Sequence, residues 1–150
     1  MVIARYMLLV CGLFCSCAPS PTLPEQPPNI LFILTDDQGV GDLSIAGNDS
    51  LHTPNMDALL RSGARFDRFY VSPVCAPTRA SFLSGRYHPR TGAVYVTRRR
   101  ETMVDTLQTL PEYLRPLGYR TGLFGKWHNG ATFPYLPGSQ GFDEFLGFTL

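Results

Sequence analysis

The chain has 150 residues, with 13 lysines and arginines, 12 aspartates and glutamates, and a formal net charge of +1. This length provides for one domain at most. A charge this close to neutral gives no indication of nucleic-acid binding, so no nucleic-acid partner is expected.

The N-terminus has the character of an export signal. Arg5 precedes the apolar run 6–14, which is too short to cross a bilayer. We expect residues 1–17 to be a signal peptide, and its removal leaves 12 basic and 12 acidic residues. Residues 14–17 (Phe-Cys-Ser-Cys) are similar to a bacterial lipoprotein processing site, so lipidation of Cys17 and ordinary cleavage are both open. The protein is expected to be exported: periplasmic, extracellular or lipid-anchored to the bacterial envelope.

The cysteines leave one thiol for the folded body. Cys11, Cys15 and Cys17 lie in or beside the signal, and Cys75 is the fourth. No disulfide can form within the body, although an exported protein is in a compartment that permits one. The lone Cys75 is therefore either converted to another functional group or simply buried.

After a proline-rich tether at 18–28, residues 29–35 (Asn-Ile-Leu-Phe-Ile-Leu-Thr) form a continuous apolar run. Such a run is typical of a strand buried on both faces, as in a parallel sheet. It ends abruptly at Asp36 and Asp37. Two adjacent carboxylates just past a strand suit a hard cation, Ca²⁺ or Mg²⁺, although a cap or turn also favours aspartate.

The next elements are predicted from caps and periodicity. Thr53 and Pro54 begin a helix that ends at Gly63. Residues 64–71 alternate polar and apolar side chains, which favours a strand. The segment 75–79 (Cys-Ala-Pro-Thr-Arg) then begins a second helix. Free N–H groups at its N-terminus favour an anion, and the arginine four residues after the cysteine lies on the same face.

The last part predicts a loop, a helix and a strand. Residues 91–106 are polar, and the three arginines at 98–100 favour a solvated loop over contact with an anionic substrate. A helix is expected from Thr109 to Gly118, and an apolar strand at 119–124. After it come Lys126 and His128, whose spacing places both on one side, with a histidine able to transfer protons near neutral pH. The tail 137–148 is rich in glycine and aromatic residues.

Alternating strands and helices indicate an α/β fold. Ligands in such folds bind beyond the carboxyl ends of the strands. We therefore expect one shared site, formed by the residues that follow 29–35, the residues that follow 119–124 and the start of the helix at Cys75.

These segments together resemble the type I sulfatases. The family signature, Cys-x-Pro-Ser-Arg followed by Leu-Thr-Gly-Arg, is matched here by 75–79 and by 83–86 (Leu-Ser-Gly-Arg), with Thr78 in place of the commoner serine. Residues 29–38 resemble the family's first strand and its Asp-Asp pair. Gly-Lys-Trp-His at 125–128 is similar to the family's Gly-Lys-Trp-His-Leu-Gly, with Asn129 replacing leucine, and 137–143 resembles a further family block.

The resemblance implies an alkaline-phosphatase-like sandwich with a mainly parallel central sheet, of which residues 29–150 would be the N-terminal part. It implies that a maturing enzyme oxidises Cys75 to formylglycine, whose hydrate attacks sulfur. Calcium would be held by Asp36, Asp37 and the modified Cys75. By the same resemblance, Arg79 and Lys126 would bind the sulfate, and His128 would hydrogen-bond to the formylglycine hydroxyls.

The expected function is hydrolysis of sulfate esters of sugars or aryl alcohols. Family members are longer, with further metal ligands and a leaving-group acid in later residues, so the isolated 150-residue chain is not expected to turn over substrate. Two alternatives stay open: a phosphoester or phosphonate hydrolase with the same site, and a non-catalytic exported module with unmodified Cys75. Any membrane contact would be through the lipid anchor.

Overall fold

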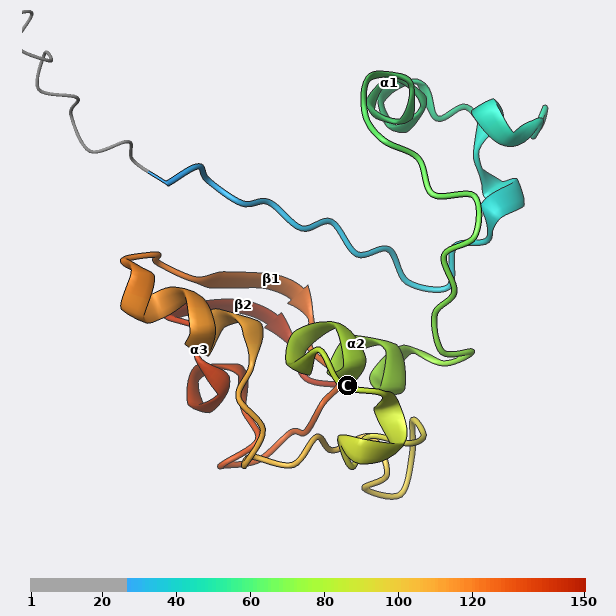
Figure 1. Cartoon of the computed structure of the whole chain (residues 1–150). Coiled ribbons are helices and arrows are strands. Elements are labelled where there is room, and N and C mark those ends of the chain that lie inside the picture. The colour runs from blue at the N-terminus through green and yellow to red at the C-terminus, as the bar shows by residue number, and fades with distance from the viewer. Residues whose placement is uncertain (1–26) are drawn as a thin grey trace, which may run out of the picture. The chain divides into compact units, whose positions relative to one another are not determined.

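The computed structural model describes residues 27–150 (Figure 1). The signal at 1–17, the possible lipidation at Cys17 and all but the end of the tether at 18–28 lie outside the described residues. The chain divides between Leu34 and Thr35 into two compact units. The larger unit, 35–150, contains every expected site residue except Cys17, and the following description concerns this unit unless stated otherwise.

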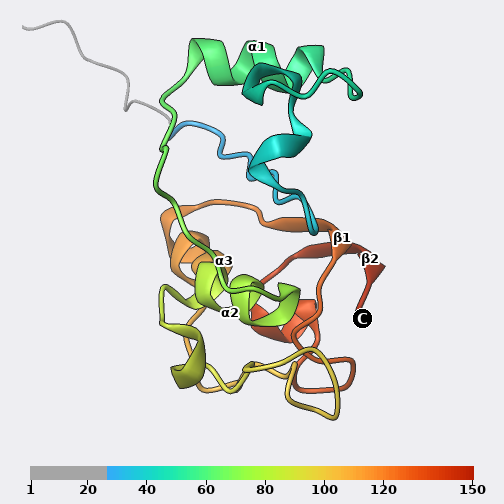
Figure 2. The same ribbon diagram turned by 90° about the vertical axis from the view of Figure 1, so that its right-hand side faces the viewer.

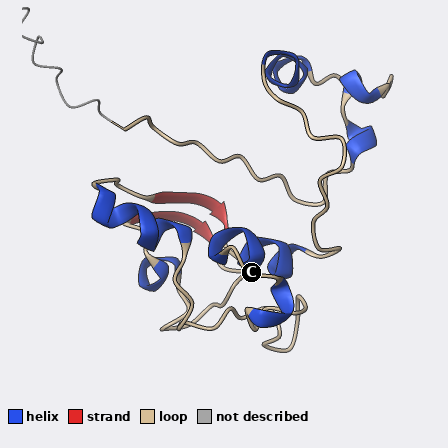
Figure 3. Ribbon diagram, in the orientation of Figure 1, coloured by secondary structure: helices blue, strands red, loops and turns tan. Residues whose placement is uncertain are grey.

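Three α-helices precede a pair of strands (Figure 3). The helices are α1 (Pro54–Ser62), α2 (Cys75–Ser84) and α3 (Leu110–Leu114), and short 3-10 turns occur before α1, between α2 and α3, after α3 and between the two strands. The strands are β1 (Gly122–Lys126) and β2 (Glu144–Phe148). Helices and a parallel sheet in one unit agree with the expected α/β class.

The two strands are parallel neighbours, and they run side by side in Figures 1 and 2. Gly122 lies opposite Glu144 at one end, and Lys126 lies opposite Phe148 at the other. The ladder continues past β1, because the Trp127 N–H donates to the Phe148 carbonyl at 2.9 Å. The backbone is therefore held in place up to the residues expected to form the site.

The predicted boundaries of α1 are confirmed, whereas the helix expected from Thr109 to Gly118 is divided into α3 and a 3-10 turn at Arg115–Leu117. Thr53 and Gly63 flank α1, and Gly118 closes the turn after α3 in a left-handed conformation with φ 87°. The Thr109 N–H donates to the Glu112 carboxylate at 2.7 Å, as in a capping box. These ends follow local backbone chemistry, which is why the sequence located them.

Two expected strands are not formed, so these predictions were wrong. Residues 29–35 and 64–71 have no strand assignment, and the side chains of Leu31 and Ile33 are 83% and 73% exposed. A strand needs a hydrogen-bonded neighbour, and within the described residues the sheet consists of β1 and β2 alone. An apolar run or an alternating pattern shows that a segment is able to join a sheet. It does not show whether a neighbouring strand is present to pair with it.

The third expected strand begins later than predicted, and β2 was not predicted. Residues 119–124 were expected, whereas β1 starts at Gly122. The carbonyl of Thr121 accepts from the N–H groups of Asp143 and Glu144 at 2.9 and 3.1 Å. Thr121 is thereby tied to the turn before β2, and regular pairing starts one residue later.

The core lies between α2 and the end of β1. Its buried members are Ala80, Leu83, Ala93, Met103 and Trp127. Ala80 and Leu83 are three residues apart and so share one face of α2. Trp127 is 1% exposed, and this burial packs the end of β1 against the helix that begins at Cys75.

Much apolar surface is uncovered in this chain. On β2, Phe145, Leu146 and Phe148 are 38%, 74% and 56% exposed, although parallel sheets are ordinarily covered on both faces. Among residues 27–150, no helix combines the length and the apolar character needed to cross a bilayer.

Candidate active site

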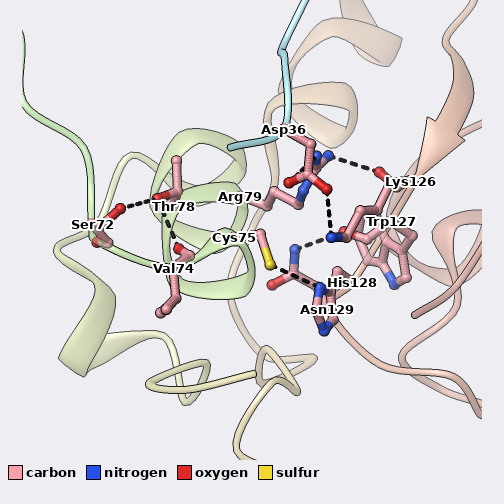
Figure 4. A network of polar contacts seen from close by, with 10 residues as sticks. All are labelled: Asp36, Ser72, Val74, Cys75, Thr78, Arg79, Lys126, Trp127, His128 and Asn129. Atoms are coloured by element: carbon pink, nitrogen blue, oxygen red, sulfur yellow. Dashed lines mark hydrogen bonds and ion pairs between the residues drawn. The ribbon is translucent and has the colours of Figure 1, made fainter. Parts of the chain in front are cut away.

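Cys75 is the first residue of α2, as predicted, and its thiol is free and half-buried. Val74 precedes it in an extended conformation, so the chain turns sharply into the helix at the cysteine. Pro77 lies within the first turn, where the N–H that proline lacks would have had no partner in the helix. The Cys75 sulfur is 3.2 Å from Nδ1 of His128 (Figure 4).

Thr78 fixes the backbone that leads into this turn. Its hydroxyl Oγ1 lies 2.9 Å from the Ser72 carbonyl and 3.0 Å from the Val74 carbonyl, so its single proton is shared between two acceptors (Figure 4). A second contact holds the same segment, because Ser72 Oγ is 2.9 Å from Nδ1 of His88. Sequence reasoning assigned no positioning role to Thr78 or to His88.

Arg79 connects α2 to the end of β1. Its guanidinium donates through Nη1 to the Lys126 carbonyl at 2.8 Å and pairs through Nη2 with Asp36 Oδ1 at 3.4 Å. The residue is only 8% exposed, and its Nε has no partner in the part of the chain that the structure describes. Arg79 is therefore held rigidly beside Cys75, with one buried donor left over.

Lys126 and Asp36 form the closest ion pair of the site. The ammonium Nζ lies 2.6 Å from Asp36 Oδ2. The hydrogen bond from Lys126 is the main cause that lowers the pKa of Asp36. Burial opposes the charged form of Lys126, but contacts with Asp36 and Cys75 outweigh it and raise the pKa of Lys126. Both groups are thus ionised at neutral pH, and the pair survives there.

His128 has contacts at both ring nitrogens. Nε2 is 3.3 Å from the Val96 carbonyl, which can only accept, so Nε2 carries the proton of the neutral ring. Nδ1 then faces the Cys75 sulfur as an acceptor. The backbone of His128 is left-handed, with φ 57°, a conformation that costs energy outside glycine and recurs at functional sites.

The alternation of the chain around Trp127 separates site from core. Lys126 and His128 reach the polar network, whereas the Trp127 ring enters the core and donates through Nε1 to the Tyr135 carbonyl at 2.9 Å. Asn129 follows, fully buried, with Nδ2 3.3 Å from the Trp127 carbonyl and Oδ1 lacking a partner in residues 27–150. The sequence showed Asn129 only as a replacement for leucine, and its polar contact with the Trp127 carbonyl was not predicted.

The expected metal ligands are only partly assembled. Asp36 joins the network, but Asp37 is exposed and makes no hydrogen bond or ion pair with any other described residue. Over the same residues no group of three or more His, Cys, Asp or Glu side chains could hold a metal ion. Carboxylate oxygens are the type of ligand that a hard cation prefers. Asp36 and Asp37 would provide two ligand residues, whereas Ca²⁺ takes about 6–8 oxygen ligands.

A model of the Sulfatase family matches residues 28–150. The chain belongs to the sulfatase family. Mouse steryl-sulfatase is 41% identical to this chain over 145 aligned positions, which cover 86% of this chain and 23% of the relative. Human N-acetylgalactosamine-6-sulfatase is 40% identical over 134 positions, covering 81% of this chain and 26% of the relative.

Two solved structures with 35% sequence identity show the same fold. Ps i-CgsB, in complex with a neocarrahexaose, has a TM-score of 0.70 and 35% identity over 75% of this chain and 26% of its own. BT4656, in complex with its substrate D-glucosamine-2-N,6-O-disulfate, has a TM-score of 0.66 and 35% identity over 79% of this chain and 22% of its own. The fold is thus part of the alkaline-phosphatase-like α/β architecture, and the chain spans about a quarter of the length of these relatives.

Proposed function

We propose that this chain is the N-terminal part of a catalytic domain that hydrolyses sulfate esters through a formylglycine made from Cys75. The observation that carries the proposal is the 3.2 Å contact between the Cys75 sulfur and His128 Nδ1 at the N-terminus of α2. Arg79 and Lys126 lie in the same network and supply two cations. A nucleophile position, a proton-transferring group and two cations beside a helix N-terminus suit a tetrahedral anion.

Each residue of the network would have a different role in the reaction. A formylglycine at position 75 would supply a hydrated aldehyde whose hydroxyl attacks sulfur. His128, with Nδ1 directed at position 75, would hold and accept the proton of a hydroxyl there. Lys126 and Arg79 would bind the sulfate oxygens and stabilise the charge that develops on them. Asp36 keeps both cations in place, because its two oxygens contact one each.

A divalent cation belongs to the same proposal. Asp36 and Asp37 would hold it, with position 75 as a third ligand, and we propose Ca²⁺ with Mg²⁺ as the alternative, since both prefer oxygen ligands. The cation would polarise a sulfate oxygen. The carboxylate of Asp36 already contacts Arg79 and Lys126. A bound cation would therefore compete with the Lys126 ammonium for the Asp36 oxygens.

The substrate is proposed to be a sugar or aryl sulfate. Several relatives are named for sulfated sugars, and the solved BT4656 holds a disulfated glucosamine. A tetrahedral phosphate could also enter the site, so paired aryl sulfate and aryl phosphate esters should be compared. Faster turnover of the phosphate ester would contradict the proposal.

We predict that Cys75 of the exported protein is formylglycine. The conversion would be made by a maturing enzyme before folding, because the α2 terminus is partly covered in the folded chain. Peptide mass spectrometry on the segment that contains Cys75 and Arg79 is expected to show an aldehyde of lower mass than the thiol. Exclusive recovery of the thiol from a host that has the maturing enzyme would overturn the assignment.

We predict that Asp37→Asn weakens cation binding without unfolding the protein. The side chain is exposed and has no partner among residues 27–150, so its loss removes ligand charge rather than structure. In the longer protein, the calcium concentration for half-maximal turnover should rise about tenfold. Asp105→Asn, which neutralises another exposed carboxylate, is the matched control. An equal calcium requirement in both variants would show that Asp37 only shapes a turn.

A further inference from the structure

A tight turn at residues 97–100, here termed the arginine turn, carries three consecutive arginines. The Arg100 N–H donates to the Thr97 carbonyl at 3.1 Å. The N–H groups of Val94 and Tyr95 donate to the Arg100 carbonyl at 2.8 and 2.9 Å. Three backbone hydrogen bonds thus define the conformation, so the turn presents its side chains from a fixed backbone.

The charges of the arginine turn are not neutralised by the chain around them. Arg98, Arg99 and Arg100 are all exposed, and none pairs with a carboxylate of residues 27–150. Arg100 stacks over the Tyr95 ring at 5.8 Å, and Arg98 and Arg99 have left-handed backbones with φ 59° and 63°. Three adjacent cations repel one another, and an anionic ligand would relieve that repulsion.

The turn lies beside the candidate active site. The Val96 carbonyl is 3.3 Å from Nε2 of His128, whose other nitrogen contacts Cys75. Arg98 follows Val96 by two residues, and two residues of extended chain span at most about 7 Å. The backbone of the turn therefore begins next to the ring of His128, in a segment separate from Arg79 and Lys126.

We propose that the arginine turn binds a second anionic group of the substrate, which is accordingly a saccharide with more than one sulfate or carboxylate. This inference rests on the proposed sulfatase function. Arg79 and Lys126 serve the sulfate that is cleaved, and Asp36 partly neutralises both. The arginine turn has no such carboxylate, and guanidinium groups bind sulfate and carboxylate through paired N–H donors. The turn therefore selects multiply charged substrates and does not take part in the chemical step.

Equilibrium binding tests this separation without turnover. All measurements use the longer protein with Cys75→Ala, and calorimetry gives the Kd for D-glucosamine-2-N,6-O-disulfate and for glucosamine-6-O-sulfate. The double variant Arg98→Gln/Arg99→Gln should bind the disulfate about tenfold more weakly, and the monosulfate within about twofold of the parent. Arg68→Gln removes one charge from another exposed arginine, which forms no ion pair with a described residue, and should change neither value. The single variant Arg99→Gln is used if the double variant does not fold.

The outcomes separate this inference from the proposed function. Equal losses for both sugars, unchanged binding of both, or no binding of either by the parent would overturn the role of the turn. In protein that retains Cys75, hydrolysis of the monosulfate should be the same with and without the two substitutions. If that protein hydrolyses no sulfate ester, the proposed function is wrong. The difference between the two Kd values still decides whether the arginine turn binds a second anionic group.

Discussion

Replacing Cys75 with alanine is expected to abolish sulfate ester hydrolysis in the longer protein while the fold is retained. Cys75 occupies the helix N-terminus, its sulfur contacts His128, and no other described residue presents a free thiol. Loss of an enzyme's nucleophile typically costs several orders of magnitude in turnover, and we expect at least about 10³-fold here. Alanine suits a helix, so the free energy of unfolding should change little.

Ser81→Ala is the matched control for this prediction. It removes a small polar group from the middle of the same helix, and the Ser81 hydroxyl makes no hydrogen bond with a described residue of the site. Turnover of an activated aryl sulfate and a thermal unfolding curve should be measured for both variants. Residual activity near the parent level in Cys75→Ala would show that another group attacks sulfur. A large loss in Ser81→Ala would show that the helix tolerates no change.

Gly147→Ala is expected to be the most destabilising single substitution in the sheet. A Cβ at position 147 would collide with the backbone carbonyl of Gly125 on the neighbouring strand. Backbone atoms cannot turn aside as a flexible side chain can, so β1 and β2 would have to separate. Overpacking of this kind costs about 3 kcal/mol in the free energy of unfolding. The change should also disturb the site, because β2 positions the residues after Lys126.

Gly138→Ala provides the comparison, because Gly138 lies in the 3-10 turn between β1 and β2 and not on a strand. Gly138 is exposed, and a Cβ there would meet no heavy atom within 4 Å. Its free energy of unfolding should lie within about 0.5 kcal/mol of the parent. Denaturant unfolding of the two variants measures the difference directly. Similar stabilities would mean that the close approach of Gly125 and Gly147 is relaxed in solution.

The sequence alone singled out several residues that the structure brings together, Asp36, Cys75, Arg79, Lys126 and His128, and it located most helix ends. The Thr109 N–H donates to the Glu112 carboxylate and the Gly118 N–H donates to the Arg115 carbonyl, both three residues away, so local sequence is enough to place these ends. The position of Cys75 at a helix start, with Arg79 on the same face, follows from the same local rules. Likewise, the two-residue spacing of Lys126 and His128 predicted that their side chains share one face of the chain and that the Trp127 side chain lies on the opposite face.

Tertiary structure alone decided the pairings between distant segments. Asp36 lies 90 residues from the Lys126 ammonium that it contacts, and no local pattern specifies that contact. The left-handed backbone of His128 and the position of Val96 beside it were equally invisible in the sequence. The apolar run at 29–35 shows the reverse case, because it has the composition of a buried strand and yet forms none among the described residues. Hydrogen bonding between strands depends on which neighbour is present, and that is a property of the assembled fold.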